Sequence, residues 1–270
     1  MTTRRTFLTS AAAATLTGPA AFAKAPFVLG VASYSLRNLS RADAIAAIQK
    51  LNVHHVSIKE FHLRYTSTPE EIAAARKEFA AAKIKILSGG NIDLKGDDAT
   101  LRKMFEYAKA SGMPMMVCAP SMKTLPMVER LVKEFNIRAA IHNHGPEDKH
   151  FPTPQSVLDA VRTMDPRMGL CIDIGHTVRT GADVVESIQV AGQAGRLFDL
   201  HVKDLKDLRD AKSQCAVGEG AMPVKEVFLA LKKLNFRGGA MLEYEINADA
   251  PVPGMEKSFA FMRQVVAQIG

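Results

Sequence analysis

Cysteine is scarce in this chain, and the few copies exclude a disulfide framework. Three cysteines, Cys118, Cys171 and Cys215, are spread over 270 residues, and none belongs to a CxxC pair. Small disulfide-stapled domains use many more cysteines at close spacing. Cys118 and Cys171 also lie inside apolar runs. We therefore predict buried free thiols and a fold that is held together by its hydrophobic core.

Long apolar runs, linkers and low-complexity segments are missing beyond residue 23. No run there approaches the ~18 apolar residues of a membrane helix, so we expect no membrane insertion of that part. With 47% hydrophobic and 23% charged residues, the chain can build one large core. The net charge of +7 falls to +5 without the two arginines of residues 1–23, and it is spread along the chain. Such a spread charge does not indicate nucleic-acid binding.

The N-terminus has the features of an export signal. Arg4-Arg5 precedes Phe7-Leu8, an alanine-rich run over 11–21 and the small-x-small sequence Ala21-Phe22-Ala23. This order is typical of a cleaved signal peptide, and the paired arginines indicate the twin-arginine route. We expect residues 1–23 to be the signal and residues 24–270 to form a periplasmic protein. An ordinary secretory peptide is the alternative.

Short apolar runs alternate with helical patterns along the rest of the chain. Helix starts are marked by Ser40 and by Thr68-Pro69-Glu70-Glu71, where a capping residue precedes good helix formers. The expected strands are 27–34, 55–60, 84–88, 115–118, 138–142, 169–173, 197–201 and 240–243. Eight strands, each followed by a helix, predict an α/β fold: a single-domain (β/α)8 TIM barrel. A doubly wound sheet is disfavoured because no glycine-rich loop follows the first strand.

Polar residues interrupt the ends of the last four strands. In a (β/α)8 barrel the catalytic groups lie at the carboxyl ends of the strands, where side chains alternate between the two faces. With Ile172, Leu200 and Leu242 turned outward, the intervening polar residues turn into the barrel. The inward residues are His142, Asp173, His201 and Glu243, with His144 and Lys203 on the same faces.

Four such groups in one place predict a metal site. Burying several carboxylates and imidazoles together costs several kcal/mol unless a cation or good partners satisfy them. Two imidazoles and two carboxylates suit Mn, Co, Zn or Fe(II) better than calcium. The predicted ligands are His142, Asp173, His201 and Glu243.

The second strand carries a further inward group, Lys59. With Val56 and Ile58 packed outward, its side chain projects into the barrel. We expect the ammonium to polarise a keto oxygen or to hold a carboxylate of the substrate. An ion pair with an acid of a neighbouring strand is the alternative.

Several of these runs together resemble the xylose isomerase-like barrel superfamily of sugar phosphate isomerases and epimerases. They are Asn143-His144-Gly145, Asp173 with His176, His201-Val202-Lys203-Asp204 and Leu242-Glu243. The resemblance implies metal ligands Glu, Asp, His and Glu on the last four strands. By position these are His142, Asp173, His201 and Glu243. The chain departs from the family pattern at His142, where the family has a glutamate. For the epimerases of the family, the resemblance implies two glutamates that face each other across the substrate. Because one of them is replaced here, a two-sided 3-epimerase mechanism is not implied for this chain.

The resemblance implies proton transfer beside a sugar carbonyl, through an enediolate that the metal stabilises. The expected catalytic residues are Glu243 as base and ligand, Lys59, His144 and Lys203. The expected substrate-binding residues are His62, His176 and Glu245. Glu245 is also the alternative base. His176 could instead support the metal ligand Asp173, which lies three residues before it.

Three functions stay open, and all take a small sugar or glycoside as the partner. The first is a sugar isomerase or epimerase. The second is a lyase or hydratase, because Lys59-x-x-His62 and the run from Ile141 to Glu147 resemble a branch that is linked to 3-keto-glycosides. The third is a non-catalytic sugar-binding barrel. A barrel endonuclease is disfavoured, since it needs more zinc ligands. The sequence leaves the oligomeric state open.

Overall fold

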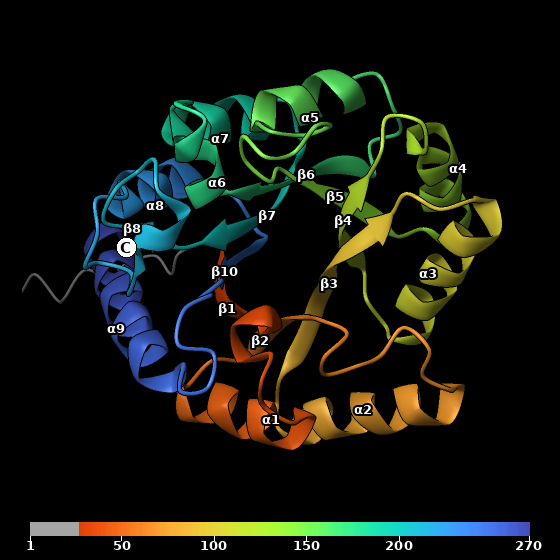
Figure 1. Cartoon of the computed structure of the whole chain (residues 1–270), viewed down its shortest axis with the longest axis horizontal. Helices are drawn as coiled ribbons and strands as arrows, with labels where there is room; N and C mark the ends of the chain where they lie inside the picture. The colour runs from red at the N-terminus through yellow and green to blue at the C-terminus, as the bar shows by residue number, and fades with distance from the viewer. Residues whose placement is uncertain (1–26) are drawn as a thin grey trace, which may run out of the picture.

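The computed structural model describes residues 27–270, and the expected signal over 1–23 lies outside the described residues. Eight parallel strands close into one barrel in the order β1-β10-β7-β6-β5-β4-β3-β2 (Figure 1). They are β1 (Val28–Ala32), β2 (His55–Ile58), β3 (Lys85–Leu94), β4 (Met115–Pro120), β5 (Arg138–His142), β6 (Met168–Asp173), β7 (Leu197–Val202) and β10 (Gly239–Leu242). The predicted single-domain TIM barrel is confirmed.

The helices surround this barrel as an outer ring (Figure 1). The ring consists of α1 (Arg41–Lys50), α2 (Pro69–Ala81), α3 (Asp98–Ala110), α4 (Leu125–Phe135), α5 (Pro154–Val161), α7 (Val184–Gln193), α8 (Val224–Lys233) and α9 (Val252–Ile269). Ser40 accepts a hydrogen bond from the Asp43 amide at the start of α1. Thr68 and Glu71 form a capping box at the start of α2. Both helices therefore begin where the capping residues predict.

Several predicted strand ends differ from the structure. The second strand ends at Ile58 rather than at residue 60, and the fourth runs on to Pro120 rather than ending at residue 118. The first strand stops at Ala32, and a 3-10 helix, η1 (Ser33–Leu36), follows it. The Ser35 hydroxyl accepts from the Tyr244 amide at 2.8 Å, which ties this turn to the end of β10. The third strand runs on to Leu94 because Gly90, with φ +150°, fits closely against β4. A Cβ there would lie 2.1 Å from the Val117 carbonyl oxygen, so only glycine lets the strand continue.

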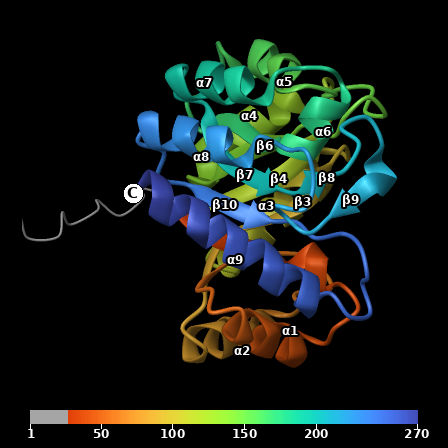
Figure 2. The same cartoon turned by 90° about the vertical axis from the view of Figure 1, so that its left-hand side faces the viewer.

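Two further elements stand at the carboxyl ends of the strands. A short helix, α6 (Ile174–Arg179), begins directly after β6, and the Asp173 carboxylate caps it by accepting from the His176 amide at 2.8 Å. A hairpin of β8 (Asp204–Leu205) and β9 (Gln214–Cys215) follows β7 and projects from this end of the barrel (Figure 2). Neither element was expected from the sequence.

The core has two parts. The larger part fills the space between the strands and the helices, and Phe79, Phe105, Phe228 and Phe259 are fully buried in it. The smaller part forms a separate cluster of Met115, Val117, Ala140, Cys171 and Phe198. All three cysteines are buried and free, as predicted. Within residues 27–270 no helix has the length and apolar character that crossing a membrane requires.

Candidate metal centre and cavity

The structure brings the four predicted metal ligands together at the carboxyl ends of β5, β6, β7 and β10. One donor atom from each of His142, Asp173, His201 and Glu243 lies within 4.8 Å of all the others, and all four residues are buried. Nε2 of His142 lies 3.2 Å from Nδ1 of His201. That Nδ1 lies 3.1 Å from Oε2 of Glu243. Small side-chain shifts would place the four donors at the bond lengths of about 2.1 Å that a single divalent ion requires.

Lys203 is the buried cation of this cluster. Its Nζ lies 2.9 Å from Oδ2 of Asp173, 2.9 Å from Oε2 of Glu243 and 3.0 Å from Oε1 of Glu245. Gly175 leaves room for the lysine stem, since a Cβ there would lie 2.6 Å from Cδ of Lys203. The structure thus places this predicted catalytic residue within the ion cluster, and it does not line the cavity described below.

The charges of the cluster fit a divalent ion. Asp173, Glu243 and Glu245 supply three carboxylates, and Lys203 supplies one ammonium. Burial opposes protonation of His201, yet Cys171 and Glu243 raise its pKa well above the usual range. The carboxylates still outnumber these two cations. Burial works against ionisation, yet Lys203 holds the pKa of Asp173 well below its usual range. Burial likewise opposes the effect of His201 and Lys203, which lower the pKa of Glu243. The donor set and the charge therefore both suit a metal of the Mn, Co, Zn or Fe(II) type.

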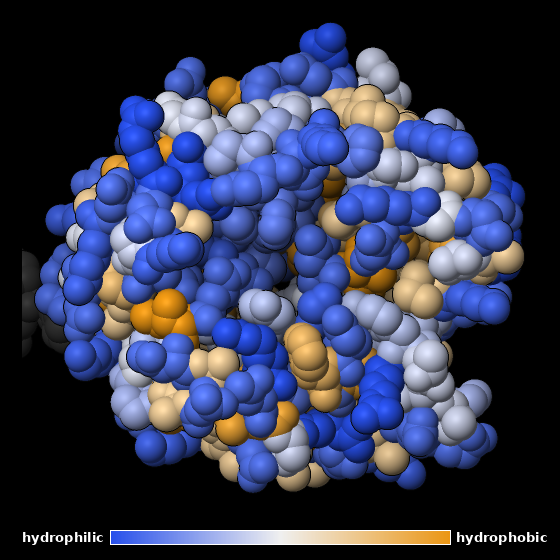
Figure 3. Space-filling view, viewed as in Figure 1, coloured by the Kyte–Doolittle hydropathy of each residue, from blue (hydrophilic) through white to orange (hydrophobic). Residues whose placement is uncertain are grey.

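A cavity of about 260 Å³ opens above these donors. It is lined by Tyr34, Lys59, Asn91, His142, His144, His176, Glu243 and Glu245. Figure 3 shows the middle of this face of the molecule as a hollow with a mostly hydrophilic surface. Because pockets for drug-sized ligands measure roughly 300–1,000 Å³, this cavity suits a smaller polar ligand.

Histidines form one wall of the cavity. The rings of His144 and His176 lie 4.4 Å apart between centroids, at an angle of 35°. Burial lowers the pKa of His176 to about 3, so its imidazole is neutral at physiological pH. Nδ1 of His176 lies 3.1 Å from a guanidinium nitrogen of Arg179. A neutral imidazole beside the cavity can accept or donate one hydrogen bond to a sugar hydroxyl.

Lys59 stands at the end of β2 and lines the cavity, as its inward direction predicts. Val56 and Ile58 pack outward in the larger core. Nζ of Lys59 donates to the Asn91 carbonyl at 2.7 Å and pairs with the Glu60 carboxylate at 2.8 Å. The ion-pair partner is therefore its own neighbour in the chain and not an acid of another strand.

His62 is not brought to the cavity. It is 2% exposed, and its two ring nitrogens lie 3.0 Å from the Ser33 hydroxyl and 3.2 Å from the Leu36 carbonyl. The same Ser33 hydroxyl accepts from the Lys59 amide at 2.8 Å. This geometry gives His62 a structural contact between the segments that follow β1 and β2, whereas a substrate contact was expected.

Sequence reasoning overlooked two residues of the cavity wall. Tyr34 follows β1 and packs beside Phe61, with ring centroids 6.0 Å apart, and under the Arg37 guanidinium at 4.7 Å. Asn91 belongs to the part of β3 that was not expected to be strand. The polar residues after the glycine pair Gly89-Gly90 were the available signal for a longer strand.

The segment after β7 fixes the position of Glu243 and Glu245. The buried Asp204 carboxylate accepts backbone hydrogen bonds from Gly218, Gly220 and Met222, at 2.8, 3.1 and 3.0 Å. These bonds hold the segment that contains the β8–β9 hairpin. The Gln214 side chain then donates to the Glu243 carbonyl and accepts from the Glu245 amide, at 2.9 and 2.8 Å. The hairpin therefore orients the backbone at the end of β10.

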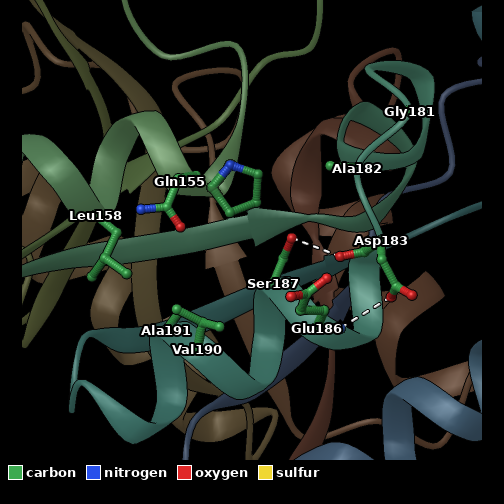
Figure 4. A pocket seen from close by; sticks show the side chains of 10 residues that line it. Gln155, Leu158, Gly181, Ala182, Asp183, Glu186, Ser187, Val190 and Ala191 are labelled. Atoms are coloured by element: carbon green, nitrogen blue, oxygen red, sulfur yellow. Dashed lines mark hydrogen bonds between the residues drawn. The ribbon is translucent and has the colours of Figure 1, made fainter.

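A larger hollow of about 490 Å³ lies between the outer helices α5 and α7 (Figure 4). Gln155 and Leu158 come from one side and Asp183, Glu186 and Val190 from the other. Asp183 caps α7 by accepting from the Val185 and Glu186 amides. None of the predicted site residues lines this hollow, so it does not belong to the metal centre.

The family model of the xylose isomerase-like TIM barrel matches residues 42–265. The chain belongs to this family. No curated protein matches the chain in sequence.

Solved structures agree with this assignment. An uncharacterised protein from Parabacteroides distasonis is 27% identical, with a TM-score of 0.69 over 89% of this chain and 99% of its own. The IolI protein with a bound zinc atom is 15% identical, with a TM-score of 0.74 over 90% and 99% of the two chains. An L-ribulose 3-epimerase is 12% identical, with a TM-score of 0.73 over 90% and 95%. The likeness to the last two shows the fold.

Proposed function

We propose that this family member is a divalent-metal-dependent enzyme of the isomerase or epimerase type, which removes a proton beside the carbonyl of a small sugar. One observation carries the proposal: four convergent metal donors lie below a polar cavity that also holds a carboxylate, an ammonium and two imidazoles. The fold likeness to a zinc-bound protein and to a 3-epimerase supports it. A barrel that only binds a sugar would not need buried, mutually close carboxylates and imidazoles.

His142, Asp173, His201 and Glu243 would hold the metal. A bound divalent ion would act as a Lewis acid and stabilise the negative charge that develops on the carbonyl oxygen. Lys203 pairs with the carboxylates of Asp173 and Glu243 and fixes their orientation.

Metal binding and proton removal, both expected mainly of Glu243 from the sequence, are better divided between Glu243 and Glu245. The Glu243 side chain is 11% exposed and contacts both His201 and Lys203, which suits a ligand. The Glu245 side chain is 38% exposed, lines the cavity and makes its ion pair with Lys203. A general base must reach the substrate proton, so we assign proton removal to Glu245 and metal binding to Glu243.

The cavity wall combines different acid–base groups. Glu245 is a cavity carboxylate outside the set of four metal donors, and His144 and His176 add two imidazoles to the same wall. We therefore propose that a carboxylate takes the proton and that an imidazole returns it. This asymmetry also favours one second candidate. His144 or the Lys59 ammonium could protonate a leaving glycosidic oxygen, which would make the enzyme a 3-keto-glycoside lyase.

The test uses metal-loaded protein with two matched substrate panels, free keto-sugars and 3-keto-glycosides, followed by NMR in deuterated water. Deuterium that enters one carbon without bond cleavage supports the isomerase or epimerase, and release of the aglycone supports the lyase. Glu245→Gln should keep the metal and lose turnover by about 100-fold or more, the usual size of one acid–base contribution. The control is Glu106→Gln on the outer helix α3. No deuterium exchange and no cleavage with any sugar would contradict the proposal.

The N-terminal pattern belongs to the same proposal. We propose that residues 1–23 direct the protein to the periplasm by the twin-arginine route, since Arg4 and Arg5 precede an apolar run and a small-x-small site. An exported enzyme meets sugars and glycosides rather than cytoplasmic sugar phosphates.

A further inference from the structure

Cys171 stands directly beneath the proposed metal centre. It lies two residues before Asp173 on β6, so both side chains point to the same face of the strand. Cys171 is paired with His142 in the register of β5 and β6. It belongs to the small cluster with Met115, Val117 and Ala140 and not to the core beneath the helices.

The thiol and the two histidines form a second set of donors. The sulfur of Cys171 and one ring nitrogen each of His142 and His201 lie within 4.8 Å of one another, and all three residues are buried. Nε2 of His142 and Nδ1 of His201 face each other at 3.2 Å. Of the remaining nitrogens, Nδ1 of His142 is buried without a hydrogen-bond partner among the described residues. The His201 ring interacts with the Cys171 thiol. Buried polar atoms without a partner are rare in folded proteins and call for an explanation.

We propose that Cys171 is a metal ligand, which gives the chain a second position, His142–Cys171–His201, for a thiophilic ion such as zinc or cobalt. The proposal rests on the metal centre of the proposed function through the two shared histidines. On binding, the metal–sulfur bond forms as the thiol proton leaves to solvent, because a coordinating thiol is deprotonated. Two nitrogens and one sulfur form a set that zinc accepts in known proteins.

The two donor sets differ in chemical softness, and this difference has a consequence for the metal that supports turnover. Manganese prefers carboxylates and would stay with Asp173 and Glu243 beside the cavity. Zinc and cobalt bind thiolates well, so Cys171 draws them away from the carboxylates and from the substrate. The Cys171 thiol would therefore determine which bound metal supports turnover.

The absorption of the cobalt-loaded full-length protein tests the proposal. A thiolate-to-cobalt charge-transfer band in the near ultraviolet is expected for the natural chain at one equivalent of cobalt. Cys171→Ala and Cys171→Ser should lose the band and still bind cobalt through the carboxylate set. Cys118→Ala is the matched control, since Cys118 is also a buried free thiol and belongs to neither donor set, and it should keep the band.

Competition between metals gives a second readout. Cys171→Ala should weaken zinc binding by about 10-fold or more, at least the loss that follows when a supporting group of a metal site is removed. Manganese binding should change little. Bound cobalt without a charge-transfer band, or a band that persists in Cys171→Ala, would overturn the role of the thiol and leave the proposed function intact. A natural chain that binds neither cobalt nor manganese would remove both proposals.

Discussion

The two halves of the barrel provide different groups to the same cavity. The carboxyl-terminal half, β5 to β10, supplies a buried cluster of His142, Asp173, His201 and Glu243, and Lys203 pairs with its two carboxylates. The amino-terminal half, β1 to β4, supplies Tyr34, Lys59 and Asn91, whose contacts are single hydrogen bonds, one ion pair and ring packing. Within residues 27–270, all of the buried carboxylates lie in the carboxyl-terminal half. The carboxyl-terminal half therefore offers a donor set that suits a divalent metal, and the amino-terminal half adds polar groups to the wall of the cavity.

Lys203 gives the largest expected change in stability. Lys203→Met removes the one ammonium that contacts Asp173, Glu243 and Glu245. Removal of one partner from a buried ion cluster destabilises a protein by roughly 3–5 kcal/mol. We expect that loss in thermal unfolding with a chelator present and a partial recovery when divalent metal is added. An equal stability of Lys203→Met and the natural chain under both conditions would show that the cluster is not coupled in this way.

Lys59 tests the opposite half. Lys59→Met should change stability by no more than about 1 kcal/mol, because its ion-pair partner Glu60 is solvent-accessible and its other contact is one carbonyl. Turnover should fall by about 100-fold, the typical effect of one electrostatic contact to developing charge. Metal content should stay that of the natural chain. A stable and fully active Lys59→Met protein would remove the amino-terminal half from the mechanism.

His62 separates support from recognition within that half. His62→Gln should lower stability by about 1–3 kcal/mol, because one of the two buried contacts, to Ser33 or to Leu36, loses its partner. Metal binding and KM should both stay close to those of the natural chain. A large rise in KM with unchanged stability would show that His62 contacts the substrate after all.

The export signal gives the smallest effect on the folded barrel. Replacing Arg4 and Arg5 by lysine should leave the protein in the cytoplasm, as fractionation and an immunoblot would show. The protein that is recovered there should have the stability and metal content of the exported one. Unimpaired export of this variant would indicate the general secretory route.

The fold and the metal cluster could be predicted from sequence because simple periodicities carry them. Alternation along each strand places Asp173 and His201 on the inward face, and a barrel gathers all strand ends at one mouth. The prediction needed no knowledge of loop conformation. The same alternation on the second strand predicts that the Lys59 side chain points into the barrel, where it lines the cavity.

The rest depends on contacts between segments that are distant in sequence. His62 follows Lys59 closely, but a turn after β2 folds its ring back onto Ser33. Lys203 points inward as predicted, yet three carboxylates from two other strands hold it below the cavity surface. Asn91 reaches the cavity only because Gly90 lets β3 continue. The contacts of His62 and Lys203 leave no local pattern in the sequence, and the extension of β3 leaves only the polar residues after Gly89-Gly90.

Metal stoichiometry in matched variants tests the central claim most directly. Elemental analysis and calorimetric titration with manganese would be carried out on the natural chain, Asp173→Asn, His201→Gln and Lys59→Met. The account predicts one bound ion in the natural chain and in Lys59→Met, and loss of stoichiometric metal in the two variants of the carboxyl-terminal half. Circular dichroism would verify that all four proteins are folded. Full metal occupancy in folded Asp173→Asn and His201→Gln would contradict it.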